Sequence, residues 1–278
     1  MTSANPHPPP ACLLALGTSG DTCTVALRHS RDGRRVTVTR NGSPQAGRSG
    51  QILGLVRALC AEQQVELANI DVIAFDAGPG GFTALRVACG VAQGLGFALE
   101  RPLLPIGSLA AIAWQAAAGQ RVFVAIDARM GEVYCAVFDR PADGEPRAVV
   151  LPTVLAPEAA VQLFERCRAV DATAPADAAL PQPAPPQQPD DAVGDRAGAI
   201  ALGDGFARHA ALADWYRHRA LQCDPTVVPS ADALAGLAEQ AWRAGRAVAA
   251  ADAAPFYVRD KVALDVDEQA QARAGSGR

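Results

Sequence analysis

The stretch Ala74-Phe-Asp-Ala-Gly-Pro-Gly-Gly-Phe-Thr-Ala-Leu-Arg86 carries the strongest signal for the fold. Its apolar start, within Val72–Phe75, is typical of a buried parallel strand, and a glycine–proline loop then leads into a helix predicted over Thr83–Leu99. Such a loop binds a phosphate in some proteins. In others it only turns the chain and aims the following helix at a partner.

The phosphate interpretation fits the spacing of this loop poorly. The loop matches neither the Gly-x-x-x-x-Gly-Lys-Ser/Thr pattern nor the Gly-x-Gly-x-x-Gly pattern, and the only lysine, Lys261, is distant in sequence. Pro79 also removes one backbone donor and stiffens the turn. We therefore interpret Gly78–Arg86 as a segment that aims a helix.

That helix has little bulk over much of its surface. Its small residues are Ala84, Ala88, Cys89, Gly90, Ala92, Gly94, Gly96 and Ala98. A glycine inside a helix costs about 1 kcal/mol relative to alanine, so close approach by another element should offset the cost. Two alternatives stay open: the helix packs closely on its own sheet, or it packs on a second polypeptide.

The order of predicted elements repeats along the chain. The first series has strands at Leu13–Leu16, Cys23–Arg28 and Val36–Thr39, an amphipathic helix over Ile52–Cys60, and strands at Val72–Phe75 and Leu103–Ile106. A helix capped by Ser108 is expected to follow, to about Ala118. The second has strands at Val122–Asp127, Val133–Asp139 and Ala148–Leu151, a helix over Pro157–Arg168, and a strand at Ile200–Leu202. Ala125–Asp127 then aligns with Ala15–Gly17, and Tyr134–Val137 with Cys23–Ala26.

This repeat predicts an α/β protein of two similar lobes, each a mixed sheet with helices packed on it. We place the lobes at residues 12–119 and 120–262, with the last helix, Ala231–Ala244, capped by Ser230 and in the second lobe. Residues 1–11 and 263–278 are expected to be disordered tails. The proline-rich, aromatic-free segment 172–195 is expected to be a disordered insert, because it cannot bury enough apolar surface to order itself.

Composition narrows the class of protein. The net charge of −4 provides no general basic field for nucleic acid, so any RNA contact is local or carried by a partner. The seven cysteines form no Cys-x-x-Cys pair, which indicates free thiols in a reducing compartment. The N-terminus lacks the features of a signal peptide, and no uninterrupted apolar stretch reaches about 18 residues. We expect a cytoplasmic protein with no membrane contact.

A second motif surrounds Asp127, where a buried strand ends in a carboxylate. Asp127, Arg129 and Glu132 allow two interpretations: a cation or phosphate-water site, or a turn whose polar groups satisfy one another. No metal site is expected, because the four histidines form no His-x-x-x-His pair. No catalytic residues are assigned, since a Gly-x-Ser-x-Gly nucleophile motif is also absent.

Three ordered motifs resemble those of the bacterial TsaB (YeaZ) family. Gly78–Arg86 resembles its Gly-Pro-Gly-Ser-Phe-Thr-Gly-Leu-Arg signature, Asp127–Tyr134 its second hallmark, and Pro255–Ala263 its C-terminal Pro-x-Tyr-x-Arg segment. Leu14–Leu27 resembles the opening hairpin, so the likeness covers about Leu13–Ala263 apart from the insert. The residues that match the first two motifs are Gly78, Pro79, Gly80, Thr83, Asp127, Arg129, Glu132 and Tyr134.

The resemblance implies the two-lobed fold of actin, Hsp70 and the sugar kinases. It also implies a non-catalytic subunit that pairs with the catalytic paralogue TsaD, works with the ATPase TsaE, and can form homodimers. The complex would transfer a threonylcarbamoyl group to N6 of the adenosine beside the anticodon, in tRNAs that read codons beginning with A. This chain would meet tRNA only through the complex.

Two helices of the first lobe would then form the partner interface. The candidate residues are Leu53, Val56, Phe82, Leu85, Arg86, Ala88, Cys89, Ala92, Leu95 and Gly96. No cofactor is expected on this chain alone, whereas ATP and a metal ion are expected on the partner subunits.

The sequence departs from the family pattern at several positions. Gly81 replaces a serine, Ala84 a glycine, and Arg48 stands where a His-Ser pair is usual. Gly17 replaces the aspartate that ends the first strand, which weakens any independent ATP chemistry. Two alternatives remain: a nucleotide-dependent enzyme of the same superfold, and a metallo-glycopeptidase-like protein.

Overall fold

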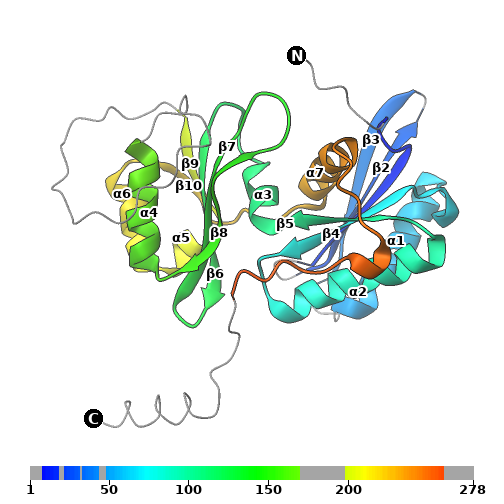
Figure 1. Ribbon diagram of the computed structural model, residues 1–278, viewed down its shortest axis with the longest axis horizontal. Helices are drawn as coiled ribbons and strands as arrows, with labels where there is room; N and C mark the ends of the chain where they lie inside the picture. Colours follow the sequence, from blue (N-terminus) through cyan, green and yellow to red (C-terminus); the bar gives the residue numbers. More distant parts are fainter. Residues whose placement is uncertain (1–7, 19–21, 32, 44–47, 170–197, 260–278) are drawn as a thin grey trace, which may run out of the picture.

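The repeat predicted from the sequence is present as two sheets of identical topology (Figure 1). The computed structural model describes residues 8–18, 22–31, 33–43, 48–169 and 198–259. The first sheet, in the order β3-β2-β1-β4-β5, consists of β1 (Cys12–Gly17), β2 (Thr24–Arg31), β3 (Arg34–Asn41), β4 (Val72–Gly78) and β5 (Leu103–Gly107). The second, in the order β10-β9-β6-β7-β8, consists of β6 (Arg121–Arg129), β7 (Glu132–Asp139), β8 (Arg147–Leu155), β9 (Ala199–Leu202) and β10 (Gln222–Asp224).

In each sheet, three antiparallel strands are followed by two parallel ones. β1 pairs antiparallel with β2 and parallel with β4, and β6 likewise pairs with β7 and β9. The parallel strands are reached through helices, as parallel pairing requires a crossover. The helices of the first lobe are α1 (Arg48–Gln63), η1 (Leu67–Asn69), α2 (Phe82–Leu99) and α3 (Ser108–Ala113). Those later in the chain are α4 (Pro157–Ala169), α5 (Gly205–Arg208), α6 (Ala210–His218), α7 (Ala231–Arg243) and η2 (Ala250–Asp252).

The register between the two hairpins differs from the predicted alignment. Ala15 pairs with Ala26 in the first hairpin, and Ala125 pairs with Cys135 in the second. Cys135 is therefore the counterpart of Ala26, two residues away from the predicted match. The cause is the shorter second turn, since β6 and β7 pair as far as Arg129 and Glu132. A shift of two residues leaves each side chain on the same face of the sheet, so the alternation of apolar residues does not reveal the shift.

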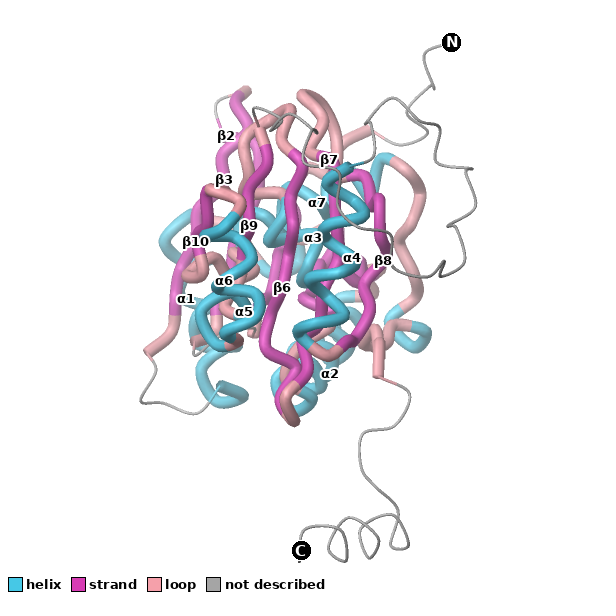
Figure 2. The backbone as a smooth tube through the Cα atoms, turned by 90° about the vertical axis from the view of Figure 1, so that its left-hand side faces the viewer, coloured by secondary structure: helices cyan, strands magenta, loops and turns pink. Residues whose placement is uncertain are grey.

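The sheets are stacked with helices between and outside them (Figure 1). α1 and α2 cover one face of the first sheet, and α7 packs on its other face through Leu13, Ala15 and Val72. α4, α5 and α6 cover the outer face of the second sheet, and Figure 2 shows α5 and α6 on one side of β6 and α4 on the other. α3 covers its inner face, where Leu109 and Ile112 contact Val122 and Val124.

The placement of the last helix corrects the predicted lobe boundary. We placed Ala231–Ala244 in the second lobe, but α7 packs on the first sheet, and its Ser230 N-cap is the one predicted. Sequence order alone could not reveal this crossover. The chain after α7 also stays with the first lobe, where Val248 pairs with Leu103.

Smaller differences occur at the edges of the elements. α6 and β10 were not predicted, and α3 is shorter than expected. Residues 8–11, assigned to a disordered tail, are described: Trp242 donates to the Pro8 carbonyl at 2.9 Å, and Pro10 is buried. The predicted disorder at residues 172–195 and 263–278 concerns segments that lie outside the described residues.

Candidate functional site

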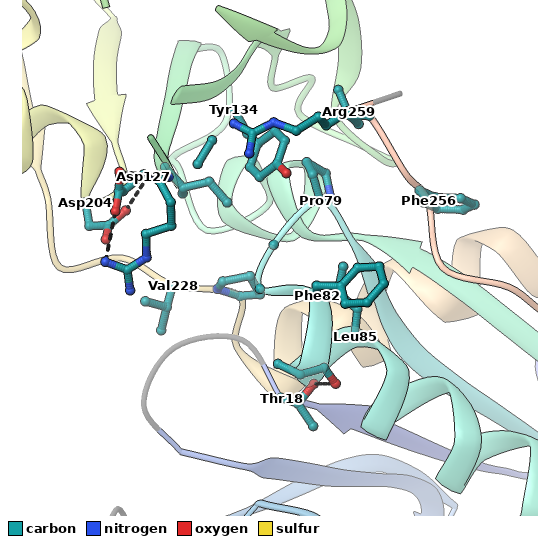
Figure 3. Close-up of a pocket in the computed structure, with 18 of the residues that line it drawn as sticks. Thr18, Pro79, Phe82, Leu85, Asp127, Tyr134, Asp204, Val228, Phe256 and Arg259 are labelled. Carbon is teal, nitrogen blue, oxygen red and sulfur yellow. Dashed lines mark hydrogen bonds and ion pairs between the residues drawn. The ribbon is translucent and has the colours of Figure 1, made fainter. Parts of the chain in front are cut away.

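A cleft of about 370 Å³ lies between the two lobes, where β6 and the loop after β4 end (Figure 3). Its walls include residues 79–82 from the first lobe, 126–129 from β6, and 256–259 from the C-terminal segment. The two main sequence motifs, far apart along the chain, thus meet at one place. Figure 3 shows Pro79 and Phe82 across the cleft from Asp127 and Asp204.

The glycine–proline turn is anchored by a buried carboxyl group. Asp76 is fully buried, and its Oδ1 accepts hydrogen bonds from the Gly78 N–H at 3.2 Å and the Ser108 hydroxyl at 2.5 Å. Gly78 has φ of +103°, and the Gly78–Pro79 peptide bond is cis. One donor of the turn is therefore already used by an acidic side chain. This arrangement fits a turn that orients α2 better than a turn that binds an anion. Asp76 was not identified from the sequence as a residue that anchors the turn. The one signal in the sequence was its position just before the turn.

The prediction that this side of α2 binds a partner is wrong, because most of the residues named for it are buried inside the first lobe. Leu85, Ala88, Cys89, Ala92 and Gly96 are buried, and Val56 of α1 is buried with them. Ala88, Cys89 and Ala92 belong to the core that α1 and α2 form with the first sheet, and Leu95 packs against that core. The alternative in which these small residues let α2 lie close to its own sheet is the one the structure supports.

A different face of α2 is exposed. Thr83, Arg86, Gly90 and Gly94 lie on it at helical spacing, and Phe97 at its end is 62% exposed. A Cβ added at Gly90 or Gly94 would meet no described atom within 4 Å. By contrast, a Cβ at Gly96 would come within 2.9 Å of the Leu103 side chain, so that glycine is explained by internal packing.

The adjacent helix α1 presents a similar surface. Leu53 is 42% exposed, Gly54 and Arg57 are exposed beside it, and a Cβ at Gly54 would also meet no described atom. α1 and α2 contact each other along the same side of the first sheet (Figure 1). We call these exposed residues, Leu53, Gly54, Arg57, Arg86, Gly90, Gly94 and Phe97, the α1–α2 face. Of the predicted interface residues it contains Leu53 and Arg86, with exposed Phe82 at its edge.

The second motif forms a network of charged groups. Asp127 accepts from the Arg129 N–H at 3.1 Å, and its carboxylate lies 3.3 Å from the Arg129 guanidinium and 3.3 Å from His209 Nε2. Asp204 accepts from the Asp127 N–H at 2.9 Å and pairs with Arg208. Asp127 is thus satisfied by neighbouring groups, as the second of the two interpretations expected.

Glu132 and Tyr134 take part in a different contact. Arg259 forms an ion pair with Glu132, and its guanidinium carbon lies 5.9 Å from the centroid of the Tyr134 ring. The C-terminal motif and the second motif are therefore in direct contact across the cleft.

The position that lacks the family aspartate has no room for one. A Cβ at Gly17 would lie 2.7 Å from the Thr24 methyl group and 3.2 Å from Leu234 of α7. Thr18, the next residue, is fully buried and donates its hydroxyl proton to the Ala84 carbonyl at 2.8 Å. Thr24 of β2 and Leu234 of α7 thus crowd the space that a side chain at position 17 would need.

Cysteine and metal chemistry have little support among the described residues. Burial raises the pKa of the Cys12 and Cys135 thiols to about 12, so neither is a reactive thiolate near neutral pH. Within the described ranges, no group of three His, Cys, Asp or Glu side chains could hold a metal ion.

By length and composition, α2 resembles a membrane-spanning helix. It has 18 residues and a mean hydropathy of 1.4, although the sequence pattern suggested too short a stretch. The core helix of a folded domain passes the same test, and α2 packs one side on β4 and β1.

Comparison with known proteins identifies relatives for the chain. The family profile described as "TsaD: tRNA N6-adenosine threonylcarbamoyltransferase" matches residues 46–163. The tRNA threonylcarbamoyladenosine biosynthesis protein TsaB of Haemophilus influenzae is 40% identical over 126 residues, covering 44% of this chain and 51% of that protein. TsaB of Escherichia coli is 34% identical over 151 residues, 51% of this chain and 64% of its own length. The chain thus aligns with about half to two thirds of these curated relatives.

A solved structure extends the likeness to the whole fold. YeaZ from Pseudomonas aeruginosa superposes with a TM-score of 0.65 at 33% identity, covering 89% of this chain and 99% of that one. The two mixed sheets described above thus form the fold that this chain shares with YeaZ. The chain belongs to the TsaB (YeaZ) family.

Proposed function

We propose that this chain is a non-catalytic subunit in the biosynthesis of threonylcarbamoyladenosine in tRNA. It would pair with a TsaD-like catalytic subunit through the α1–α2 face. Both curated relatives are named as proteins of this biosynthesis, and the matching profile is that of the transferase itself. A subunit that resembles its own partner can use the same pair of helices on both sides of the interface.

The observation that carries the proposal is the set of helical glycines without internal contacts. Gly54, Gly90 and Gly94 lie inside helices, and a Cβ at any of them would meet no described atom. Each costs about 1 kcal/mol relative to alanine. Since packing within the described chain does not offset this cost, close approach of another polypeptide is the physical reason to keep the glycines. Exposed Leu53 and Phe97 supply apolar area beside them.

The remaining parts of the proposed complex follow from the resemblance. A TsaE-like ATPase would join the pair, tRNA would be held by the complex, and a homodimer through the same face is an alternative state of the free chain. ATP and a metal ion would bind to the partner subunits. On this chain, Gly17 leaves the cleft without the first-lobe carboxylate that such chemistry uses.

A second candidate is threonylcarbamoyl transfer by this chain itself, because the matching profile carries that activity in its description. The histidines are His7, His29, His209 and His218, and their spacing provides no His-x-x-x-His pair of the TsaD type. Transfer to tRNA by the isolated chain would favour this candidate.

The test uses a tryptophan at the centre of the face. Gly94→Trp should weaken association with the TsaD-like subunit by about 10- to 100-fold, since overpacking a close helix contact costs about 1–3 kcal/mol. Gln162→Trp, on the exposed side of α4 in the other lobe, is the matched control and should bind normally. Association is measured by calorimetry, folding by circular dichroism, and modified adenosine by mass spectrometry of tRNA nucleosides in the reconstituted reaction. Normal binding by Gly94→Trp would exclude this face as the interface.

A further inference from the structure

Helix α3 packs against both lobes. α3 contacts α7 and the first sheet on one side, and its Leu109 and Ile112 pack on the inner face of the second sheet. Gln115 donates to the Val228 carbonyl at 2.9 Å, which ties the connection before α7 to the same place. α3 is therefore the axis about which the lobes would open, and the cleft lies next to it, since Val228 is part of the cleft wall.

The C-terminal segment closes the opposite side. It begins on the first lobe, where Cys89 and Gln93 of α2 donate to the Ala253 carbonyl at 3.6 Å and 3.1 Å. The Phe256 N–H then donates to the Ala77 carbonyl at 2.7 Å, beside the glycine–proline turn. This end is fixed by main-chain contacts.

Aromatic contacts continue the attachment to α2. The Tyr257 ring lies 5.8 Å from the Phe82 ring, and its hydroxyl accepts from Arg86 Nε at 3.4 Å. The Arg86 guanidinium lies 3.8 Å from the centroid of the Phe82 ring. Tyr257 is half exposed, so this part of the segment stays at the surface of the first lobe.

The far end of the segment reaches the second lobe through one side chain. Arg259 pairs with Glu132 and donates to Met130 Sδ at 3.6 Å, both in the hairpin between β6 and β7. The Arg259 side chain is only 15% exposed, whereas Glu132 is 40% exposed. Figure 3 shows Arg259 beside Tyr134, on the opposite side of the cleft from Phe82.

We propose that residues 253–259 form a latch that holds the lobes together over the cleft. Its first-lobe end is permanent, and its Arg259 end is releasable. The physical reason is the difference between the two ends: the first-lobe end has hydrogen bonds to the main chain of the segment and a ring contact, whereas the other end has the contacts of the Arg259 side chain with Glu132, Met130 and Tyr134. Because α3 resists separation on its own side, release of Arg259 opens the cleft and lets the second lobe rotate about α3.

The test measures the latch and the lobes separately. Glu132→Gln and Arg259→Gln each remove the ion pair from one side. Each should speed amide hydrogen exchange in residues 253–259 by about fivefold, as expected for loss of one partly exposed ion pair. Arg40→Gln, which breaks a more exposed ion pair with Glu62 inside the first lobe, is the control for loss of an ion pair elsewhere and should leave this segment unchanged.

Lobe orientation is read from the distance between two spin labels. The labels replace Ala61 at the exposed side of α1 and Asp214 on α6, in a Cys223→Ser background, because the other native thiols are buried. The distance distribution should broaden towards longer values in both single variants. The reversed pair Glu132→Arg with Arg259→Glu should restore it.

Two results would overturn the proposal. One is unchanged exchange in both single variants. The other is faster exchange of the segment with an unchanged distance distribution, which would make it a surface strand without a role in holding the lobes.

Discussion

The two lobes share their strand order but use the same positions differently. Each has a positive-φ glycine where the fourth strand turns into a helix: Gly78 at +103° and Gly203 at +108°. In the first lobe a single helix of 18 residues follows, α2. In the second the equivalent connection is divided into α5 and α6, which pack Phe206 and Trp215 into an aromatic core.

The difference shows that the repeated strands fix the topology, and the helix sequences decide what each lobe can offer a partner. α2 packs on its sheet through small side chains and also has glycines on its outer side whose added Cβ would meet no described atom. The hairpin ends diverge in the same way. Asp127 keeps a carboxylate with charged neighbours, while α7 and Thr24 occupy the space that a side chain at Gly17 would need.

Placing an aspartate at the end of β1, as at the equivalent Asp127 of β6, should have the largest effect on stability. Gly17→Asp should destabilise the fold by roughly 3 kcal/mol, because it combines overpacking against Thr24 and Leu234 with burial of a carboxyl group. The converse change, Asp127→Asn, keeps the size and should cost about 1 kcal/mol. Chemical denaturation of both variants measures this. Equal stability of Gly17→Asp and the parent would mean that α7 can move aside.

The inner side of α2 is tested by its most enclosed residue. Ala92→Trp should destabilise the fold by about 1–3 kcal/mol, because Ala92 is fully buried against the first sheet. Gly94→Trp, two residues away on the outer side, should leave the melting temperature within error. If Ala92→Trp has a normal melting temperature but no longer binds its partner, Ala92 lies on the outer side of α2 and our assignment of the two sides is wrong.

Glycine-to-alanine changes compare the outer and inner sides of α2 with a smaller added side chain than tryptophan. Gly94→Ala should raise the free energy of unfolding by about 1 kcal/mol, because it adds helix propensity without a clash. Gly96→Ala should lower it, since the new methyl group would approach the Arg101 carbonyl and the Leu103 side chain at 3.1 Å and 2.9 Å. Thermal denaturation under identical conditions gives both values. A gain in stability for both would remove the distinction between open and packed glycines.

The smallest expected effect lies at the edge of the second sheet. Hydrogen bonds from the hydroxyl and backbone N–H of Thr226 lower the pKa of Asp224 below its ordinary value. A lowered pKa stabilises the fold above the ordinary pKa, and this contribution is lost as the pH falls through the lowered value. Thr226→Val should raise the pKa of Asp224 towards normal, as followed by NMR of its carboxyl carbon. An identical titration in the variant would assign the shift to the backbone bond alone.

Much of the molecule is readable from the sequence alone. Within the described residues, nine of the ten strands were predicted and β10 was missed. Strands buried on both faces, such as β1 and β4, stand out as continuous apolar runs, and β3 stands out as an alternation of valine and threonine. The glycine–proline turn, the start of α2 and the Ser230 cap were also predicted, since each depends on residues within a few positions of one another. The motifs were sufficient to indicate the family.

Tertiary structure decided what depends on contacts between distant segments. The small residues of α2 occur around much of the helix, so periodicity could not tell which side meets the sheet; contact with β4 and β1 settles it. The return of α7 to the first sheet, the closure of the space at Gly17, and the contact of Arg259 with Glu132 likewise join residues far apart in the chain. Local propensity and residue spacing do not predict such contacts, because a contact between distant segments contributes energy only after both segments have packed together.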